Sequence, residues 1–265
     1  YPPGSTFKLI TLLEYIRENP DTWQDFHYTC TGTYTNGDYV VNCHDGVAHG
    51  ELDIYGILGM SCNGAFDTIA QTLNSTKWQK LAEDFGYNQS DRSQVDFPYK
   101  KSHFDIASDD SVWSRMQLAI GQGTTTVTPL LNLMMYAAIA NDGVMMTPYL
   151  VDHYLDADGN VVEQTKPKAL RSVCTKAEAE LMDEFLTYVI TNGTAAAGGS
   201  QYARVSGKTG SAQYDSTKNY HAWFCGYGTN DVSEIAVCVM IEKGGAGGIV
   251  AAPVAGQIFD YYFSR

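Results

Sequence analysis

Helical patterns of apolar residues come first along the chain, and strand patterns come late. The stretch 7–16 is apolar on most of its circumference, which predicts a buried central helix. Thr175 with Glu178 forms a capping box, and Asn192-Gly193 is a helix stop signal. Further helices are predicted over residues 75–85 with Ser75 as the N-cap, 129–141, 176–190 and about 253–263. Strands are predicted over residues 203–213, 220–228 and 234–242.

A hydroxyl and an amine lie three residues apart at Ser5 and Lys8, so a helix would place both on one face. Two prolines favour an extended approach and Gly4 permits a sharp turn, which predicts that the helix begins near Ser5. The apolar residues that follow would bury Lys8, and burial disfavours its charged form. A neutral lysine could then accept the proton of Ser5 during nucleophilic attack. The alternative is an ordinary helix start with a serine cap and a solvated lysine.

A second polar group, Ser61-Cys62-Asn63, lies in a short connection between two apolar helical segments. Ser61 could join a proton relay between Lys8 and a leaving amine. The Asn63 amide could hydrogen-bond both a substrate amide and the Lys8 side chain. Taken alone, Ser-x-Asn is a common loop composition, so its value depends on the other motifs.

The third motif, Lys208-Thr209-Gly210, lies in a segment whose alternation predicts an edge strand along a cleft. The cation of Lys208 and the hydroxyl of Thr209 suit a substrate carboxylate. Glycines at 207 and 210 would let a substrate backbone approach closely. The backbone N–H groups of Ser5 and Ser211 would then form an oxyanion hole. The alternative is a turn-flanked strand with a solvated lysine.

The ordered trio Ser-x-x-Lys, Ser-x-Asn and Lys-Thr-Gly resembles the transpeptidase domain of a class B, high-molecular-weight penicillin-binding protein. Supporting features are Pro2-Pro3-Gly4, His49-Gly50, and the run 120–123 that leads into Thr128-Pro129. The resemblance implies an α/β (α+β) fold of the penicillin-binding protein and serine beta-lactamase type. Such a fold has an antiparallel sheet with flanking helices and an all-helical part. Residues 1–265 would form one transpeptidase domain that lacks its N-terminal strands, with the pedestal domain and membrane anchor absent.

The resemblance also implies a reaction. Ser5 would attack the D-alanyl-D-alanine end of a peptidoglycan stem peptide, release D-alanine and pass the acyl group to a neighbouring amine. Beta-lactams would acylate Ser5, with Lys208, Thr209 and Ser211 holding their carboxylate and Gly210 completing the substrate site. The catalytic residues would be Ser5, Lys8, Ser61, Asn63 and Lys208, with neither metal nor cofactor. Other cell-wall synthesis proteins would be partners, at the extracytoplasmic face of the bacterial membrane.

Three other functions share these motifs. A serine beta-lactamase needs a base for its deacylating water, yet the chain has no Glu-x-x-x-Asn, and Asn63 replaces the apolar residue of the oxacillinase type. A beta-lactam receptor would use acylation of Ser5 as a binding signal. A D,D-carboxypeptidase would use water as the acceptor in place of an amine, and the sequence does not distinguish these acceptors.

Charge and hydropathy restrict the classes of partner that the chain can bind. A formal net charge of −13 and a pI near 4.7 argue against nucleic acid and against a basic membrane-binding patch. The longest apolar stretch, about residues 130–140, is too short to span a bilayer. A membrane would be reached only through an N-terminal anchor.

The cysteines leave three interpretations open. Cys30 and Cys43 border a Gly- and Thr-rich, two-stranded excursion, and Cys62 lies inside the second motif. A Cys30–Cys43 disulfide would suit an extracytoplasmic location. A structural zinc site could instead use these three cysteines with His49. Free, packed thiols are the third possibility. Three other cysteines, at 174, 225 and 238, are expected to be isolated apolar residues.

Overall fold

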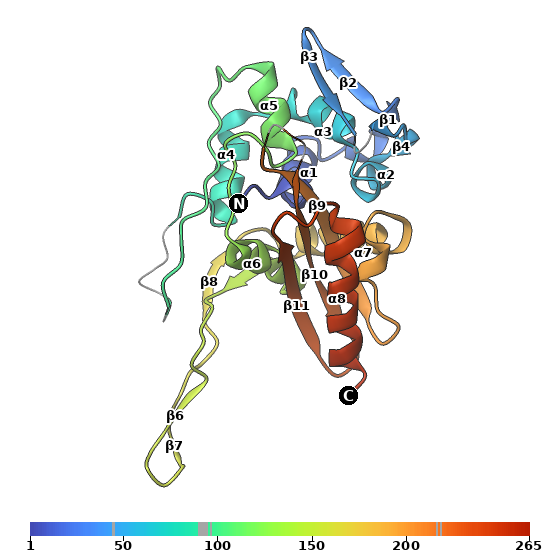
Figure 1. The fold of residues 1–265 in the computed structure, drawn as a ribbon. Helices are drawn as coiled ribbons and strands as arrows, with labels where there is room; N and C mark the ends of the chain where they lie inside the picture. The colour runs from blue at the N-terminus through green and yellow to red at the C-terminus, as the bar shows by residue number, and fades with distance from the viewer. Residues whose placement is uncertain (44–45, 90–94, 96, 216, 218) are drawn as a thin grey trace.

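A helical part and a sheet part make up the molecule in a computed structural model, as Figure 1 shows. The structure describes residues 1–43, 46–89, 95, 97–215, 217 and 219–265. The helical part comprises η1 (Gly4–Phe7), α1 (Lys8–Glu18), η2 (Trp23–Asp25), α2 (Ile54–Gly59), α3 (Asn63–Ala70), α4 (Ser75–Asp84) and α5 (Val112–Ala119). The sheet part comprises α6 (Pro129–Ala140), α7 (Lys176–Asn192), η5 (Ala196–Gly198), β9 (Arg204–Gln213), β10 (Tyr220–Thr229), β11 (Glu234–Ile241) and α8 (Gly247–Phe263). This mixture confirms the predicted α/β (α+β) class.

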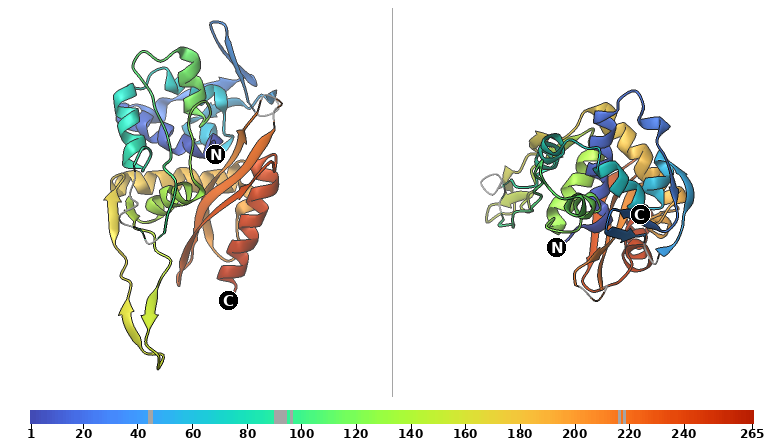
Figure 2. Two further views of the ribbon diagram at one scale, coloured as in Figure 1. Left: turned by 60° about the vertical axis from the view of Figure 1, so that its left-hand side comes forward. Right: turned by 90° about the horizontal axis from the view of Figure 1, so that it is seen from above.

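The main sheet is antiparallel, in the order β11-β10-β9. Helices α6 and α7 pack against one face of this sheet, and α8 packs against the other (Figure 2). Within the described residues β9 is therefore an edge strand, as its sequence predicted. Because η1 packs directly beside β9, the edge of the sheet meets the start of the central helix α1.

Pairs of short strands lie outside the main sheet. They are β1 (His27–Cys30) with β4 (Gly50–Asp53), β2 (Thr33–Asn36) with β3 (Tyr39–Asn42), β5 (Val144–Met146) with β8 (Ala169–Ser172), and β6 (His153–Leu155) with β7 (Val161–Gln164). The β2–β3 hairpin stands at the helical end of the molecule, whereas β6–β7 projects away from the sheet part (Figure 1). The long β6–β7 projection was not anticipated, because its short and exposed strands carry no strong hydrophobic period.

The core explains why the helical segments fold where they do. Helix α1 buries Leu9, Ile10, Leu12 and Leu13 completely, as expected for a helix that is apolar on most of its circumference. Phe7 stacks on Phe104 with ring centroids 4.8 Å apart, which ties η1 to the loop before α5. The helices α6 and α7 begin at the predicted caps, since the Thr128 and Thr175 side chains accept backbone N–H bonds.

Two predicted helix starts differ from the structure. Helix α4 is capped by the Asn74 side chain, which accepts from the Lys77 N–H, so Ser75 lies inside the helix. Helix α8 begins at Gly247, and Pro253 lies within it, where a proline start had been expected. Close packing against the sheet and a hydrogen bond from Gly247 N–H to Ser211 Oγ anchor this earlier start. Among the residues that the structure describes, no helix has both the length and the apolar character needed to cross a membrane.

Candidate active site

Ser5 and Lys8 lie where the central helix begins. Ser5 is in the 3₁₀ turn η1, Lys8 is the first residue of α1, and the Lys8 N–H donates to the Ser5 carbonyl. Gly4 has φ +56°, in the left-handed region that favours glycine, and its N–H donates to the Gly121 carbonyl at 2.9 Å. The sharp turn before Ser5 is thus present as predicted. Lys8 has no exposed surface, which excludes the solvated lysine of the alternative interpretation.

The second motif meets the first through the Lys8 amine. Lys8 Nζ donates to the Ser61 carbonyl at 2.8 Å, to Ser61 Oγ at 3.2 Å and to Asn63 Oδ1 at 2.7 Å. The motif lies in the connection between α2 and α3, as expected, and Asn63 is the first residue of α3. Ser61 has a φ of 53°, an uncommon value outside glycine. The structure therefore brings Ser61 and Asn63, which lie 53 and 55 positions further along the chain, to the Lys8 amine.

Burial controls the charge of this amine. It lowers the pKa of Lys8 to about 8, although Cys62, Cys43 and Asp67 act in the opposite direction. Lys8 Nζ also lies 5.1 Å from the centre of the Phe66 ring. The Asp67 carboxyl is buried and neither oxygen has a hydrogen-bond partner among the described residues. Burial raises the pKa of Asp67 well above its usual value, so this carboxyl favours its neutral form.

The third motif lies on the edge strand β9, beside η1. Lys208 has no exposed surface, and its Nζ donates to the Thr209 carbonyl at 3.0 Å. Burial, and then the nearby charge of Lys8, hold the pKa of Lys208 well below its ordinary value. A solvated lysine is therefore excluded here as well. The two lysines approach each other closely enough for the charge of one to disfavour the charge of the other.

The hydroxyl groups of the third motif contact neighbouring elements. Thr209 Oγ1 lies 3.0 Å from Thr194 Oγ1, in the loop after α7. Ser211 Oγ accepts from the Gly247 N–H at 3.1 Å, at the start of α8. Each hydroxyl keeps further hydrogen-bonding capacity, since a hydroxyl offers one donor and two acceptor sites.

The glycines of this strand allow close packing within the protein, and their expected role toward a substrate stays a prediction. A Cβ at Gly210 would lie 2.9 Å from the Pro3 carbonyl oxygen. A Cβ at Gly207 would lie 2.8 Å from the Phe224 ring. The room that a missing side chain leaves is thus filled by the protein itself. Glycine at 210 allows η1 to pack closely against β9, which places Ser5 beside the third motif.

Helix α6 supplies residues that the sequence reasoning missed. Tyr136 OH donates to the Thr6 carbonyl at 2.9 Å, and Asn132 Nδ2 donates to Thr6 Oγ1 at 3.1 Å. All three side chains are buried. Together with the Gly121 carbonyl, they hold the turn that carries Ser5. The available signal was a polar Asn132 within an otherwise apolar helix, because a buried amide requires partners.

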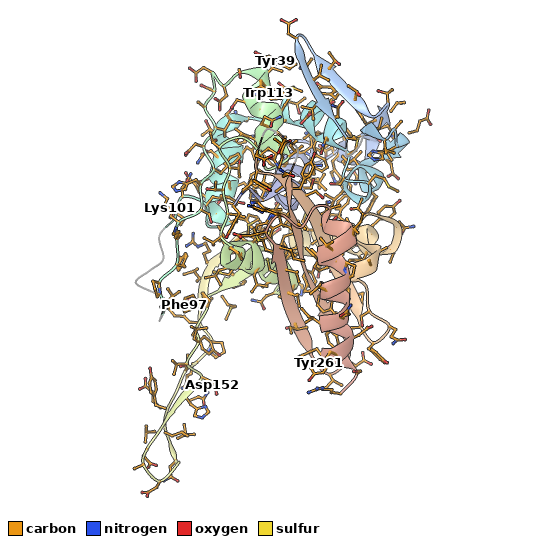
Figure 3. All side chains as sticks on the ribbon, viewed as in Figure 1. Tyr39, Phe97, Lys101, Trp113, Asp152 and Tyr261 are labelled. Carbon is orange, nitrogen blue, oxygen red and sulfur yellow. The ribbon has the colours of Figure 1, made fainter. Side chains whose placement is uncertain are left out.

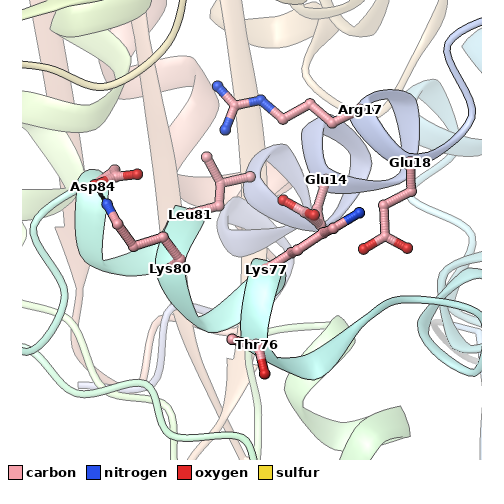
Figure 4. A pocket seen from close by; sticks show the side chains of 8 residues that line it. All are labelled: Glu14, Arg17, Glu18, Thr76, Lys77, Lys80, Leu81 and Asp84. Carbon is pink, nitrogen blue, oxygen red and sulfur yellow. Dashed lines mark hydrogen bonds and ion pairs between the residues drawn. The ribbon is translucent and has the colours of Figure 1, made fainter.

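A separate surface pocket lies along α1 and α4 and contains none of the predicted site residues (Figure 4). It is lined by Glu14, Arg17, Glu18, Thr76, Lys77, Lys80, Leu81 and Asp84. Burial, and then a hydrogen bond and charge repulsion with Glu18, raise the pKa of Glu14 to about 7. This pocket is therefore separate from the residues of the three motifs.

The six cysteines are free thiols in the structure. The expectation that Cys225 and Cys238 are isolated was wrong. They are directly opposite each other on β10 and β11, and their sulfur atoms lie 3.1 Å apart. The register of two strands produces this proximity, and register cannot be read from the separate positions in the sequence. Cys174 is buried, as expected of an apolar residue.

Comparison with known proteins identifies the family. A family model described as the penicillin binding protein transpeptidase domain matches residues 1–260. This chain belongs to that family, which confirms the resemblance seen in its motifs.

Individual relatives agree with this assignment. The chain is 28% identical to stage V sporulation protein D of Bacillus subtilis over 97% of its own length and 41% of the relative. It is 28% identical to the crystal structure of the D,D-transpeptidase domain of a peptidoglycan glycosyltransferase from Eggerthella lenta, with a TM-score of 0.85, covering 98% of this chain and 64% of that one. A structure of penicillin-binding protein 3 from Mycobacterium tuberculosis complexed with aztreonam is 25% identical, with a TM-score of 0.82, covering 100% and 62% of the two chains. The chain spans about half the length of the curated relatives it matches.

Proposed function

We propose that this chain is the catalytic domain of a class B penicillin-binding protein that cross-links peptidoglycan stem peptides through an acyl-enzyme on Ser5. The observation that carries the proposal is the buried Lys8 amine, which lies one turn after Ser5 and donates to both Ser61 and Asn63. A pKa lowered to about 8 leaves about a tenth of this amine neutral at pH 7, far more than for an ordinary lysine. The family assignment and the relatives described as D,D-transpeptidases support the same reaction.

The reaction would proceed in two transfers. Ser5 Oγ attacks the carbonyl carbon of the penultimate D-alanine while its proton passes to Lys8 Nζ. The peptide bond then breaks, and the proton returns through Lys8 and Ser61 to the amine of the departing D-alanine. A stem-peptide amine next attacks the ester carbonyl, forms the new peptide bond and returns a proton to Ser5 Oγ. A beta-lactam would follow only the first transfer, with its own ring amide as the bond that breaks.

The third motif would bind the negatively charged end of the substrate. The amine of Lys208 and the hydroxyls of Thr209 and Ser211 would hold the carboxylate, with Gly210 keeping β9 against η1. A carboxylate beside Lys208 favours the charged amine, so binding would raise the pKa that burial has depressed. The N–H groups of Ser5 and Ser211 would stabilise the developing oxyanion.

We further propose that the domain works at the extracytoplasmic face of the cell membrane with other cell-wall synthesis proteins. In this proposal it belongs to a longer protein that also carries a pedestal domain and a membrane anchor. The relatives that are named peptidoglycan D,D-transpeptidases support a role in wall synthesis.

Intact-mass analysis after incubation with benzylpenicillin tests the nucleophile. We expect one lasting adduct, mapped to Ser5 by peptide analysis, and no adduct on Ser5→Ala with an unchanged far-ultraviolet circular dichroism spectrum. A covalent adduct on Ser5→Ala would refute the assignment of the nucleophile.

Turnover of a short peptide ending in D-Ala-D-Ala separates the related functions. Release of D-alanine with capture of an added amine supports the transpeptidase. Hydrolysis of the peptide alone would indicate a carboxypeptidase, and fast loss of the penicillin adduct would indicate a beta-lactamase. A stable adduct without any peptide turnover would favour a receptor.

A further inference from the structure

Two cysteines lie directly opposite each other on neighbouring strands of the main sheet. Cys225 of β10 pairs in register with Cys238 of β11, and this pair is the fourth of eight consecutive pairs between the two strands. Their Sγ atoms lie 3.1 Å apart. Strand pairing on either side therefore fixes the backbone at both thiols. We call these two residues the cysteine pair.

The backbone geometry of the cysteine pair suits a disulfide. Residues directly opposite each other in an antiparallel ladder have Cα atoms about 4.5–5.5 Å apart, and disulfides join Cα atoms about 4.4–6.8 Å apart. The strands therefore do not need to move for a bond to form. The observed separation of the Sγ atoms exceeds the disulfide bond length by about 1 Å. A small rotation of the two side chains closes this gap.

The cysteine pair lies on the face of the sheet that α8 does not cover. Phe224, the neighbour of Cys225, packs on Phe259 of α8 with ring centroids 6.2 Å apart. Successive side chains of a strand point to opposite faces, so Cys225 and Cys238 point to the face where α6 packs. Figure 3 shows α8, with Tyr261 labelled near its C-terminal end, along the sheet. A bond would therefore form in the layer between the sheet and α6.

The two thiols differ in accessibility. Cys225 has no exposed surface, whereas Cys238 is partly exposed. Burial, and then the neighbouring Cys238, raise the pKa of the Cys225 thiol well above its ordinary value. The thiolate is the attacking species in disulfide exchange, and attack also requires access. An exchange reaction would therefore start at Cys238.

We propose that Cys225 and Cys238 form an intrachain disulfide that joins β10 to β11 covalently. The occurrence of this bond in the cell rests on the proposed extracytoplasmic location, because disulfides persist in oxidising compartments. The oxidant is an external disulfide of the thiol-exchange type.

The bond forms in two exchange steps. The Cys238 thiolate attacks one sulfur of the external disulfide, and the other external sulfur leaves as a thiol. Cys225 then attacks the Sγ of Cys238 in this mixed disulfide, and its proton passes to the second external thiolate as that group leaves. Two protein thiols are oxidised to one disulfide, and one external disulfide is reduced to two thiols.

A bond at this position supports the strand that carries the third motif. Cys225 is also directly opposite Lys208 of β9, so Lys208, Cys225 and Cys238 form one row across the sheet. Within the described residues β11 is an outer strand of this sheet. The bond ties this outer strand to the strand that sets the position of Lys208. It takes no part in acyl transfer.

Peptide mapping under non-reducing conditions detects the bond. The reduced 265-residue chain is equilibrated in a glutathione buffer of oxidising poise and then alkylated in denaturant. Cleavage after Glu234, which lies between the two cysteines, should give fragments that stay joined until a reductant is added. Cys238→Ser should lose this linkage, and Cys174→Ser, which changes a buried cysteine elsewhere, should retain it. Two alkylated cysteines, or glutathione on Cys238 without a linkage, would overturn the proposal.

Thermal unfolding measures the contribution of the bond to stability. The bond closes a loop between residues 13 positions apart, and it limits the conformations of the unfolded chain. Reduction should therefore lower the Tm of the unmodified protein by roughly 5–10 °C. Reduction should leave the Tm of Cys238→Ser unchanged. An equal fall in this variant would contradict the stabilising role.

Export and acylation separate this inference from the proposed function. The chain exported to a bacterial periplasm should carry the bond when it is isolated, and free thiols at both positions would overturn the proposal. Acylation by benzylpenicillin is measured on the same samples. Acylation without the bond would refute this inference alone. The bond without acylation would refute the proposed function alone.

Discussion

The second and third motifs each involve a fully buried lysine amine, but the structure holds them in different ways. Lys8 donates to the Ser61 carbonyl, Ser61 Oγ and Asn63 Oδ1, all from a connection between two short helices. Lys208 lies on β9, where pairing with β10 fixes the backbone, and its amine donates to the adjacent Thr209 carbonyl. The Lys8 amine is therefore held by hydrogen bonds to a loop, whereas the position of Lys208 is set by the pairing of two strands.

This difference predicts that the two motifs respond differently when their lysine is replaced. A loop has no regular hydrogen-bond ladder, so the second motif depends on the Lys8 amine and on the hydrogen bond from the Asn63 amide to the Asn42 carbonyl. The third motif inherits its geometry from ten paired positions along β9 and β10. Loss of Lys8 should therefore disturb both chemistry and geometry, whereas loss of Lys208 should disturb chemistry alone.

Among the variants that test this comparison, Lys8→Ala should reduce the acylation rate most. We expect the rate of acylation by a fluorescent penicillin to fall by roughly 10²- to 10⁴-fold, the usual contribution of a positioned base. Loss of the amine also leaves Ser61 and Asn63 without their shared donor. Lys80→Ala, which changes an exposed lysine, is the matched control. A rate within a few-fold of the unmodified protein would remove Lys8 from the mechanism.

The pH dependence of acylation should be the next largest effect. Because burial lowers the pKa of Lys8 to about 8, the neutral amine becomes scarce below that pH. The rate should rise by about tenfold per pH unit on the acid side and level off above about pH 8. Rate measurements from pH 6 to pH 10 test this expectation. A rate that falls as the pH rises through 8 would indicate that the charged amine is the active form.

Lys208→Ala should slow acylation by roughly 10- to 100-fold, because a hydrogen bond to a charged group contributes about 1.5–3 kcal/mol. The loss should appear as weaker binding of carboxylate-bearing drugs, with the thermal stability of the domain retained. Dose-dependent acylation rates separate binding from chemistry. A collapse of the fold would show that strand pairing alone does not maintain the third motif.

Glu14→Gln should have the smallest effect and serves as the control for the pH profile. Burial raises the pKa of Glu14 to about 7, so the folded state retains a proton that the unfolded state releases near pH 4.5. This residue therefore favours folding at low pH, and its contribution is lost as the pH rises through 7. Glutamine cannot ionise, so the variant should gain about 1 kcal/mol of stability at pH 8 relative to pH 5.

Thermal unfolding at the two pH values measures the effect of this variant. Its acylation profile should remain that of the unmodified protein, since the charged pocket on α1 and α4 is separate from the motifs. A shifted acylation profile would mean that Glu14 also controls Lys8.

Local patterns in the sequence were sufficient to predict the main helices and strands and to locate the motif residues. Helix starts at Thr128 and Thr175 and the strand β9 depend on neighbours along the chain, and each of these elements is confirmed. The expected alternation of β9 is absent, because its residues are buried almost without interruption. The contact of Lys8 with Ser61 and Asn63 was expected from the chemistry of their side chains, and the structure shows both hydrogen bonds. Whether these residues perform their proposed roles stays a prediction.

Contacts between segments that are distant in sequence could not be predicted from local patterns. The opposition of Cys225 and Cys238 follows from the register of β10 and β11, and the contacts of Asn132 and Tyr136 with Thr6 require the docking of α6. The proximity of Cys30, Cys43, His49 and Cys62 was only partly predictable. These residues were suspected from residue type, but the spacing of their ligand atoms appears only in three dimensions.

The anchoring of residues 1–8 has a consequence for the timescale of their motion. Trp223 Nε1 donates to the Pro2 carbonyl, the Gly4 N–H donates to Gly121, and the Lys8 N–H donates to Ser5. A segment bound to separate elements can exchange its amide hydrogens only when those elements open together. The amide of Gly4 should therefore exchange with deuterium as slowly as the amides of the paired strands.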